Sequence, residues 1–235
     1  RRKSPIQQVL NSGHIIELDN HTILISKQGV EIPVEDTAAP IIDSNGNIIG
    51  VVLVFRDVTE KREKQNEIVY LSYHDQLTGL YNRRFFEEEI NRLDTERNLP
   101  ITLVMADVNG LKLTNDAFGH RAGDRLLQTA AEVIKTECRA DDIIARMGGD
   151  EFCLLLPKTN AEEAEGIVER IKKAVTEETV GSTVLSISFG WATKREVGQA
   201  VNAVLKKAED EMYRHKLVES SSMRNHTIKL IVQTL

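Results

Sequence analysis

Residues 148–152, with the sequence Gly-Gly-Asp-Glu-Phe, constrain the fold of this chain more than any other segment. They stand between two short apolar runs, at residues 143–145 and 153–156. Paired glycines between such runs are typical of a tight β-hairpin, because glycine adopts the positive φ angles that short turns require. The sequence therefore predicts two antiparallel strands joined by a turn with two adjacent carboxylates, which are ligands that hard metal ions prefer.

Residues 75–217 alternate between strand-like and helix-like patterns. Residues 101–106 form a nearly continuous apolar run, as in a strand that is buried on both faces. Three helical patterns and one further strand-like run follow, the helices at residues 126–134, 161–176 and 197–216 and the strand at residues 184–192. This alternation, with one hairpin in it, predicts an α+β fold of α/β-like character, in which helices cover the faces of a central sheet.

The N-terminal part, residues 1–58, has mainly β patterns. Residues 23–25 and 51–55 are rich in β-branched side chains, and residues 30–35 alternate between apolar and polar. Residues 43–47 have Asn-Gly at their centre and predict a turn. We therefore expect three antiparallel strands with one hairpin around this turn, which is little material for an independent core.

Two helical segments flank the second domain. Residues 59–74 are strongly charged and carry apolar Ile68 and Leu71 at helical spacing. They predict a helical connector, which either pairs with its twin in a dimer or stays a single solvated helix. At the other end, the serines around Ser220 predict the end of one element. The apolar residues after them predict a C-terminal helix, residues 218–235, that leads to a domain outside this chain.

Composition and charge argue against several classes of protein. A net charge of −6 argues against a broad surface for a nucleic-acid polymer. No apolar run approaches the roughly 20 residues that cross a bilayer, so we expect no membrane segment in this chain. The two cysteines, Cys138 and Cys153, lie in apolar or helical contexts. We expect them to be free thiols, as in the reducing cytoplasm.

Three acidic residues predict a site for Mg²⁺ or for Mn²⁺. Asp107 follows the strand-like run at 101–106, and Asp150 and Glu151 lie in the hairpin turn. If the strands are neighbours, these carboxylates converge at one edge of the sheet. Two Mg²⁺ ions held there would activate a 3′-hydroxyl group for attack on an α-phosphate and stabilise the departing pyrophosphate. Taken singly, Asp107 could instead cap a strand end, and the other two could be solvated turn residues.

The chain resembles the GGDEF family of diguanylate cyclases in two motifs. One is the pentapeptide, and the other is Asp107-Val108-Asn109-Gly110-Leu111-Lys112-x-x-Asn115-Asp116-x-x-Gly119-His120-x-x-Gly123-Asp124. The resemblance covers residues 75–217 and implies a domain similar to nucleotide cyclases and the polymerase palm. It also implies that two chains, each with one GTP, face each other as a homodimer and form cyclic di-GMP and two pyrophosphates.

The same resemblance assigns roles residue by residue. The residues that would hold the metal are Asp107, Val108 through its backbone carbonyl, Asp150 and Glu151. Asp150 would also take the proton of the 3′-hydroxyl group. Guanine would be read by Asn115 and Asp124, because a carboxylate suits the N–H edge of that base. The residues that would bind the phosphates are Asn109, Gly110 and Leu111 through their backbone N–H groups, and Lys112 and Lys216 through their side chains.

A second short motif, Arg139-x-x-Asp142, resembles the family's inhibitory site for its product. By this resemblance Arg139 would contact guanine or phosphate of cyclic di-GMP, and Asp142 would accept from a guanine N–H edge. The alternative is an ordinary ion pair at the end of a helix.

The N-terminal part is similar to the C-terminal half of a PAS sensor domain. The stretches that carry the similarity are residues 29–34, 39–41, 43–50 and 55–59. The similarity implies a partial PAS sheet before the connector. The alternative is a small β appendage that only dimerises or packs.

Three further functions stay open from the residues alone. The chain could be a receptor that binds GTP or cyclic di-GMP and regulates an adjoining domain, a cyclase that makes another dinucleotide, or a structural dimerisation module. The presence of both Asp107 and Asp150 favours catalysis, because a pure receptor has no need of the two together.

Overall fold

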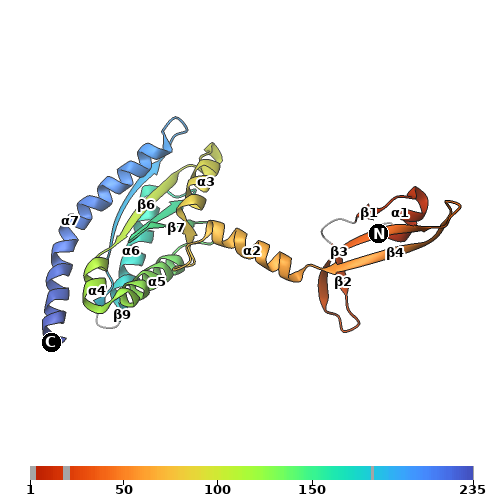
Figure 1. Cartoon of the computed structure of the whole chain (residues 1–235). Coiled ribbons are helices and arrows are strands. Elements are labelled where there is room, and N and C mark those ends of the chain that lie inside the picture. Colours follow the sequence, from red (N-terminus) through yellow and green to blue (C-terminus); the bar gives the residue numbers. More distant parts are fainter. Residues whose placement is uncertain (1–3, 18–21, 181–182, 235) are drawn as a thin grey trace. The chain divides into compact units, whose positions relative to one another are not determined.

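The computed structural model of the chain describes residues 4–17, 22–180 and 183–234, with side chains except at residues 179, 180, 183 and 219–234. The chain divides into two compact units, Arg1–Tyr70 and Leu71–Leu235, and each is considered by itself (Figure 1). Both units combine helices and strands, which confirms the predicted α+β class. Within the described ranges, no helix has the length and apolar character needed to cross a bilayer.

The first unit is a small antiparallel sheet with one short helix. Its elements are α1 (Pro5–Ser12), β1 (Ile16–Glu17), β2 (Thr22–Ile25), β3 (Glu31–Ile42) and β4 (Ile48–Asp57). β3 pairs with each of the other three strands, and its hairpin with β4 surrounds the predicted turn, where Asp43 accepts the N–H groups of Asn45 and Asn47 at 2.8 Å. The expectation of three strands is wrong, because β1 also pairs with β3. Two residues are too few to show an alternating pattern.

The connector helix α2 (Thr59–Tyr73) follows the sheet. The carboxylate of Asp57 accepts the backbone N–H of Thr59 at 2.8 Å, which satisfies one donor at the start of the helix. The apolar residues Ile68 and Leu71 are exposed in the single chain. In the described chain these two side chains of α2 therefore stay largely open to solvent.

The second unit is built on a five-stranded sheet in the order β11-β6-β8-β7-β5. The strands are β5 (Tyr81–Asn82), β6 (Ile101–Val108), β7 (Ile143–Gly148), β8 (Glu151–Leu156) and β11 (Ile187–Lys194). Neighbours are antiparallel except β5 and β7, which are parallel. A separate ribbon pairs β9 (Thr179–Val180) with β10 (Thr183–Val184).

Helices cover both faces of this sheet (Figure 1). They are α3 (Arg83–Leu93), α4 (Leu111–Phe118), α5 (His120–Glu137), α6 (Ala161–Glu177) and α7 (Val201–Thr234), with a 3₁₀ turn at Glu96–Asn98. Along β6, Val104 and Ala106 enter the core formed with α5 and α6, whereas Leu103 and Met105 enter the core formed with α3 and α7. All of β6 is buried, which explains why its sequence is apolar without alternation.

The predicted hairpin is confirmed as β7 and β8, which pair around residues 148–152. Gly148 has a φ angle of 142° and Gly149 one of 56°, values that side chains other than glycine rarely adopt. The glycine pair is therefore required by the backbone of the turn. Asp150 then lies in the turn, and Glu151 begins β8.

The expectation that an element ends near Ser220 is wrong. α7 continues without interruption from Val201 to Thr234, so residues 218–234 belong to the same helix. Serine is a weaker helix former than alanine, but it imposes no backbone constraint of the kind that proline does. The last residue of the expected C-terminal helix, Leu235, lies outside the described residues.

Gly190 allows α7 to lie directly on β11. A Cβ atom at this position would stand 2.0 Å from the backbone nitrogen of Met212 and 2.4 Å from the carbonyl oxygen of Ala208. These are backbone atoms in the middle of a packed helix and cannot move aside independently. The missing side chain thus fixes how closely α7, which carries Lys216, approaches the sheet.

We predict that Gly190→Ala lowers the free energy of unfolding by about 2–3 kcal/mol, because the added methyl group overpacks the contact between α7 and β11. The matched control is Gly166→Ala on the exposed face of α6, where a Cβ meets nothing within 4 Å. This control should be neutral or stabilising by up to about 1 kcal/mol. Urea unfolding of both variants measures the difference, and equal stabilities would contradict the close contact.

Candidate active site

The end of β6 meets the β7–β8 turn at one edge of the sheet. Asp107 is paired in register with Glu151, and the backbone N–H of Val108 donates to the carbonyl oxygen of Asp150 at 2.9 Å. The structure therefore brings together the three acidic residues that the sequence analysis singled out. It also places Val108, the fourth predicted metal ligand, directly beside them.

Lys216 reaches this acidic edge from α7. Its Nζ donates to Oδ2 of Asp107 at 2.6 Å and lies 4.0 Å from Oδ2 of Asp150. A residue 109 positions further along the chain than Asp107 thus shares one charged cluster with it. In this arrangement the lysine contacts carboxylates, whereas the sequence analysis expects it at phosphates.

Asp107 is an unusual carboxylate because it is only 2% exposed. Burial raises its pKa to about 6, the Lys216 ammonium opposes this shift, and the nearby charge of Asp150 adds to it. Its Oδ1 atom is buried and has no hydrogen-bond partner. A buried acceptor of this kind is costly unless something binds it.

The unpartnered Oδ1 atom of Asp107 fits a site for a divalent cation. Mg²⁺ binds few protein oxygens and keeps the rest of its shell for water and phosphate. The free Oδ1 of Asp107 and the neighbouring carboxylates of Asp150 and Glu151 supply oxygen atoms of the correct type. In the described part of the chain, however, no three acidic, histidine or cysteine side chains already stand close enough to enclose a metal ion. Side-chain movement, with displacement of Lys216, would accompany binding.

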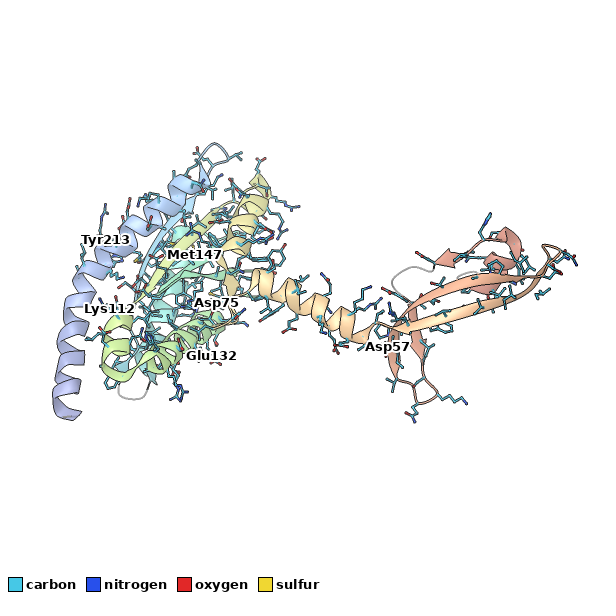
Figure 2. All side chains as sticks on the ribbon, viewed as in Figure 1. Asp57, Asp75, Lys112, Glu132, Met147 and Tyr213 are labelled. Carbon is cyan, nitrogen blue, oxygen red and sulfur yellow. The ribbon has the colours of Figure 1, made fainter. Side chains whose placement is uncertain are left out.

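Arg146 is a site residue that the sequence analysis missed. Its guanidinium donates from Nη2 to the carbonyl oxygen of Gly149 at 2.7 Å, and it forms an ion pair of 3.1 Å with Asp75. Asp75, labelled in Figure 2, also accepts the N–H of Thr78 at 2.9 Å. Arg146 thus ties the glycine turn to the segment that follows α2. The position of Arg146 just before the paired glycines could have indicated a role in the turn. Its partner Asp75, however, is 71 residues away in sequence, so no local sequence pattern indicates the ion pair.

Asn109 corrects one part of the predicted phosphate site. Its backbone N–H donates to the carbonyl oxygen of Ser186 at 2.9 Å, and its side-chain amide donates to the hydroxyls of Ser186 and Ser188. The prediction that this N–H cradles a phosphate is therefore wrong for the described conformation. The N–H groups of Gly110 and Leu111 remain at the start of α4, where a helix leaves donors unsatisfied.

The predicted guanine-reading residues lie on α4 and α5. Oδ1 of Asn115 is buried and has no hydrogen-bond partner. Gly123 makes room for this amide, because a Cβ there would stand 2.1 Å from Oδ1. Asp124 is exposed near the start of α5. Lys112 is exposed on α4 (Figure 2).

Arg139 and Asp142 line a separate cavity of about 250 Å³, together with residues from the segment that follows α2. Asp142 is buried, and its Oδ2 accepts the backbone N–H of Arg139 at 2.8 Å. Burial raises the pKa of Asp142. Among the described residues the two side chains form no ion pair, so the helix-end pair considered from the sequence is absent.

Comparison with known families identifies the class of this protein. The sequence profile described as "Diguanylate cyclase, GGDEF domain" matches residues 72–222, which is more than half of the chain, and a PAS domain profile matches residues 1–60. The chain therefore belongs to the GGDEF family and carries a PAS match before its GGDEF domain.

Several curated relatives are similar over most of this chain. The probable diguanylate cyclase DgcE of Escherichia coli K12 is 38% identical over 163 residues, which cover 68% of this chain and 15% of that protein. Diguanylate cyclase DgcM of the same strain is 30% identical over 71% of this chain and 41% of its own length. Signaling protein YkoW of Bacillus subtilis is 29% identical over 91% of this chain and 27% of its length. The chain thus spans less than half of these relatives.

Solved structures with a similar fold include two GGDEF proteins. The coiled coil and GGDEF domain of DgcB from Caulobacter crescentus, solved with c-di-GMP, has a TM-score of 0.62 and 28% identity, over 68% of this chain and 88% of that one. Diguanylate cyclase SiaD from Pseudomonas aeruginosa, solved with its activator SiaC, has a TM-score of 0.59 and 30% identity, over 68% and 64%.

We predict that Asp107→Asn changes the pH dependence of stability in the metal-free chain. The folded-state pKa of Asp107, about 6, exceeds the unfolded value of about 3.9. Between about pH 3.9 and about pH 6, Asp107 is therefore protonated in the folded chain but ionised in the unfolded chain. As the pH rises through this range, the free energy of unfolding falls, by at most about 3 kcal/mol in total. The amide of the Asp107→Asn variant would not titrate.

The stability of Asp107→Asn relative to the unaltered chain should consequently increase from about pH 4 to about pH 6 and level off above. Urea unfolding with a chelator present, repeated across this range, gives the difference between the two proteins. A difference that does not vary with pH would show that burial of Asp107 carries no such cost.

Proposed function

We propose that this chain is a diguanylate cyclase that condenses two GTP molecules into cyclic di-GMP and two pyrophosphates. The observation that carries the proposal is the acidic edge formed by Asp107, Asp150 and Glu151, next to the start of α4. The similarity to proteins named diguanylate cyclases supports it. A receptor or a structural dimerisation module has no need of an unpartnered buried carboxylate oxygen at this edge.

A divalent cation, Mg²⁺ or Mn²⁺, fits the oxygen atoms of this edge. The groups that would hold it are the carboxylates of Asp107, Asp150 and Glu151 and the backbone carbonyl of Val108. When bound, it would lower the pKa of the attacking hydroxyl group and offset the charge of the phosphates. Lys216 would give up its contact with Asp107 and turn its ammonium group to the triphosphate.

Other groups of the protein would bind the nucleotide or transfer a proton. The N–H groups of Gly110 and Leu111, at the start of α4, would hold phosphate oxygens, since a helix N-terminus favours negative charge. Oδ1 of Asn115 would accept from the guanine amino group, and Asp124 would accept from its N–H edge. These contacts hold the α-phosphate in place for the incoming hydroxyl.

Each of the two phosphodiester bonds of cyclic di-GMP is formed by the same step. The 3′-hydroxyl oxygen of one GTP attacks the α-phosphorus of the other, Asp150 takes the hydroxyl proton, and the bond to pyrophosphate breaks. One domain binds one GTP and the product contains two nucleotides, so two chains must face each other with two-fold symmetry and the step occurs twice. The connector α2 precedes each domain and would set the arrangement of the pair.

We predict that the chain converts GTP with Mg²⁺ to cyclic di-GMP, and that Asp150→Asn lowers the rate at least about 100-fold, because both the base and a metal ligand are lost. Lys173→Ala, an exposed change on α6, should keep full activity. Chromatographic separation of products from GTP, from ATP and from their mixture distinguishes this cyclase from one that makes another dinucleotide. A folded dimer that leaves GTP unchanged would favour a receptor.

We further propose that the cavity at Arg139 and Asp142 binds the product and slows the enzyme. Asp142 uses one oxygen for the Arg139 N–H, which leaves the other available to a guanine N–H edge. The similarity to DgcB, which was solved in complex with c-di-GMP, supports the choice of ligand.

Asp142→Ala and Arg139→Ala should each weaken inhibition by added cyclic di-GMP about tenfold or more, since each removes a charged hydrogen-bonding group. Asp141→Ala, the exposed neighbour, is the matched control and should be inhibited like the unaltered chain. Initial rates at increasing product concentration provide the measurement. Inhibition curves that coincide for all three variants would move the inhibitory site elsewhere.

A further inference from the structure

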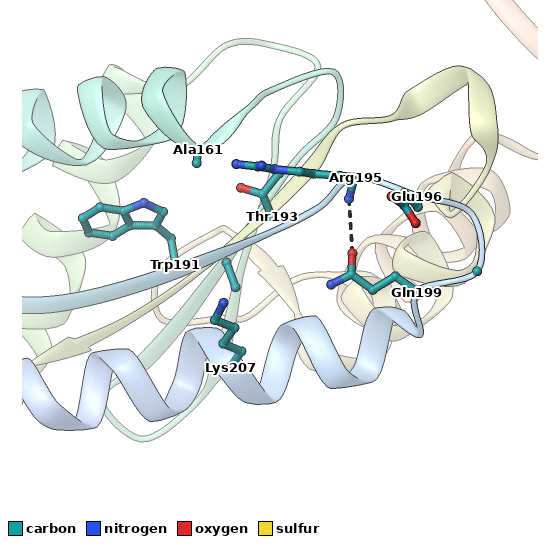
Figure 3. A pocket seen from close by; sticks show the side chains of 9 residues that line it. Ala161, Trp191, Thr193, Arg195, Glu196, Gln199 and Lys207 are labelled. Atoms are coloured by element: carbon teal, nitrogen blue, oxygen red, sulfur yellow. Dashed lines mark hydrogen bonds between the residues drawn. The ribbon is translucent and has the colours of Figure 1, made fainter.

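A second cavity, of about 710 Å³, lies at the end of β11 that is remote from Asp107. We call it the β11-edge cavity, and its lining includes Trp191, Thr193, Arg195, Glu196, Gln199 and Lys207. In Figure 3 the Arg195 side chain extends back along the strand toward Ala161, and Lys207 rises from α7 toward the strand. The volume of this cavity is within the range of sites for small molecules, about 300–1,000 Å³.

The β11-edge cavity is separate from the acidic edge. Trp191 is paired with Val104 and packs against the core formed with α5 and α6. Asp107, three residues further along β6, contacts Lys216 of α7 instead. Lys207 and Lys216 both belong to α7, but the described residues that line the β11-edge cavity do not include Asp107, Asp150, Glu151 or Lys216. A ligand in the β11-edge cavity would therefore not occupy the cyclase site.

Two cations of this cavity have no carboxylate partner. Neither the Arg195 guanidinium nor the Lys207 ammonium forms an ion pair anywhere in the described ranges, although the adjacent Lys206 is paired with Glu209 and Asp210. Glu196 is the one carboxylate among the described lining residues, so the cavity has an excess of positive charge. This excess contrasts with the net charge of −6 of the whole chain.

The remaining groups of the cavity are suited to bind an aromatic ring and the hydroxyl groups of a sugar. Trp191 is half-buried, so part of its indole faces the cavity. Gln199 accepts the backbone N–H of Arg195 through Oε1 at 3.2 Å, which orients its amide and leaves the NH₂ group as a donor. Glu196 offers an acceptor for hydroxyl groups. β11 pairs only with β6 in the described chain, so its outer edge also presents backbone groups.

We propose that the β11-edge cavity binds a nucleoside phosphate. The base stacks on the indole of Trp191, and the phosphate lies between Arg195 and Lys207, where charge-assisted hydrogen bonds hold it. An aromatic face and two unpaired cations in one cavity match a nucleoside phosphate better than an extended peptide. Such a peptide would bind mainly through the backbone groups at the edge of β11 and would not need these side chains. Binding at this cavity does not depend on the cyclase activity.

AMP is a suitable probe, because adenine lacks the adjacent N1–H and 2-amino donors of guanine that Asp124 would read. Trp191 is the only tryptophan of the chain, so its fluorescence reports directly on this cavity. Excitation at wavelengths where adenine does not absorb should give a saturable change in emission as AMP is added to the whole chain. Adenosine and inorganic phosphate, which each carry half of the ligand, should bind at least about tenfold more weakly.

Arg195→Ala and Lys207→Ala should each weaken AMP binding about tenfold, whereas Lys173→Ala and Asp150→Asn should leave it unchanged. Equilibrium dialysis with labelled AMP repeats every titration, so that binding is detected even if emission does not respond. No saturable binding in dialysis, or equal binding by Arg195→Ala and the unaltered chain, overturns the proposal. Capture of an acidic extended peptide but not of AMP does so as well.

Discussion

The burial of the Asp107 carboxylate is the constraint on which the rest of the structure depends. This carboxylate stands at the end of a fully buried strand, where little water offsets its charge. A carboxylate in such a place needs a positive partner, and here Lys216 occupies one of its oxygens while the other has none. The register of β6 with β8 then sets Glu151 opposite it, so negative charge gathers at one edge.

Several distant features maintain this arrangement. Gly190 lets α7 approach β11 closely enough for Lys216 to reach Asp107. Arg146 holds the carbonyl group of Gly149 and so restricts the turn before the two acidic residues. Because Arg146 also pairs with Asp75, the segment that follows the connector contacts the same guanidinium as the turn. A change at the connector thus has a short physical route to the acidic edge.

Much of this could be predicted from the sequence, because the relevant signals are local. Paired glycines indicated the hairpin, and the apolar run indicated β6 and the position of Asp107 at its end. The missed features depend on partners far along the chain: Arg146 needs Asp75, and the backbone N–H of Asn109 is taken by Ser186. The continuous α7 was missed because serines favour a helix end without requiring one.

The central claim is that Asp107 and Asp150 hold a divalent cation beside a triphosphate. Crystals grown with Mn²⁺ and a GTP analogue that cannot react would test it through the anomalous scattering of the metal. The expected result is a peak at about 2.0–2.3 Å from carboxylate oxygens of both residues, with Lys216 turned away from Asp107. Nucleotide bound with no metal at this edge, or metal bound only elsewhere, would contradict it.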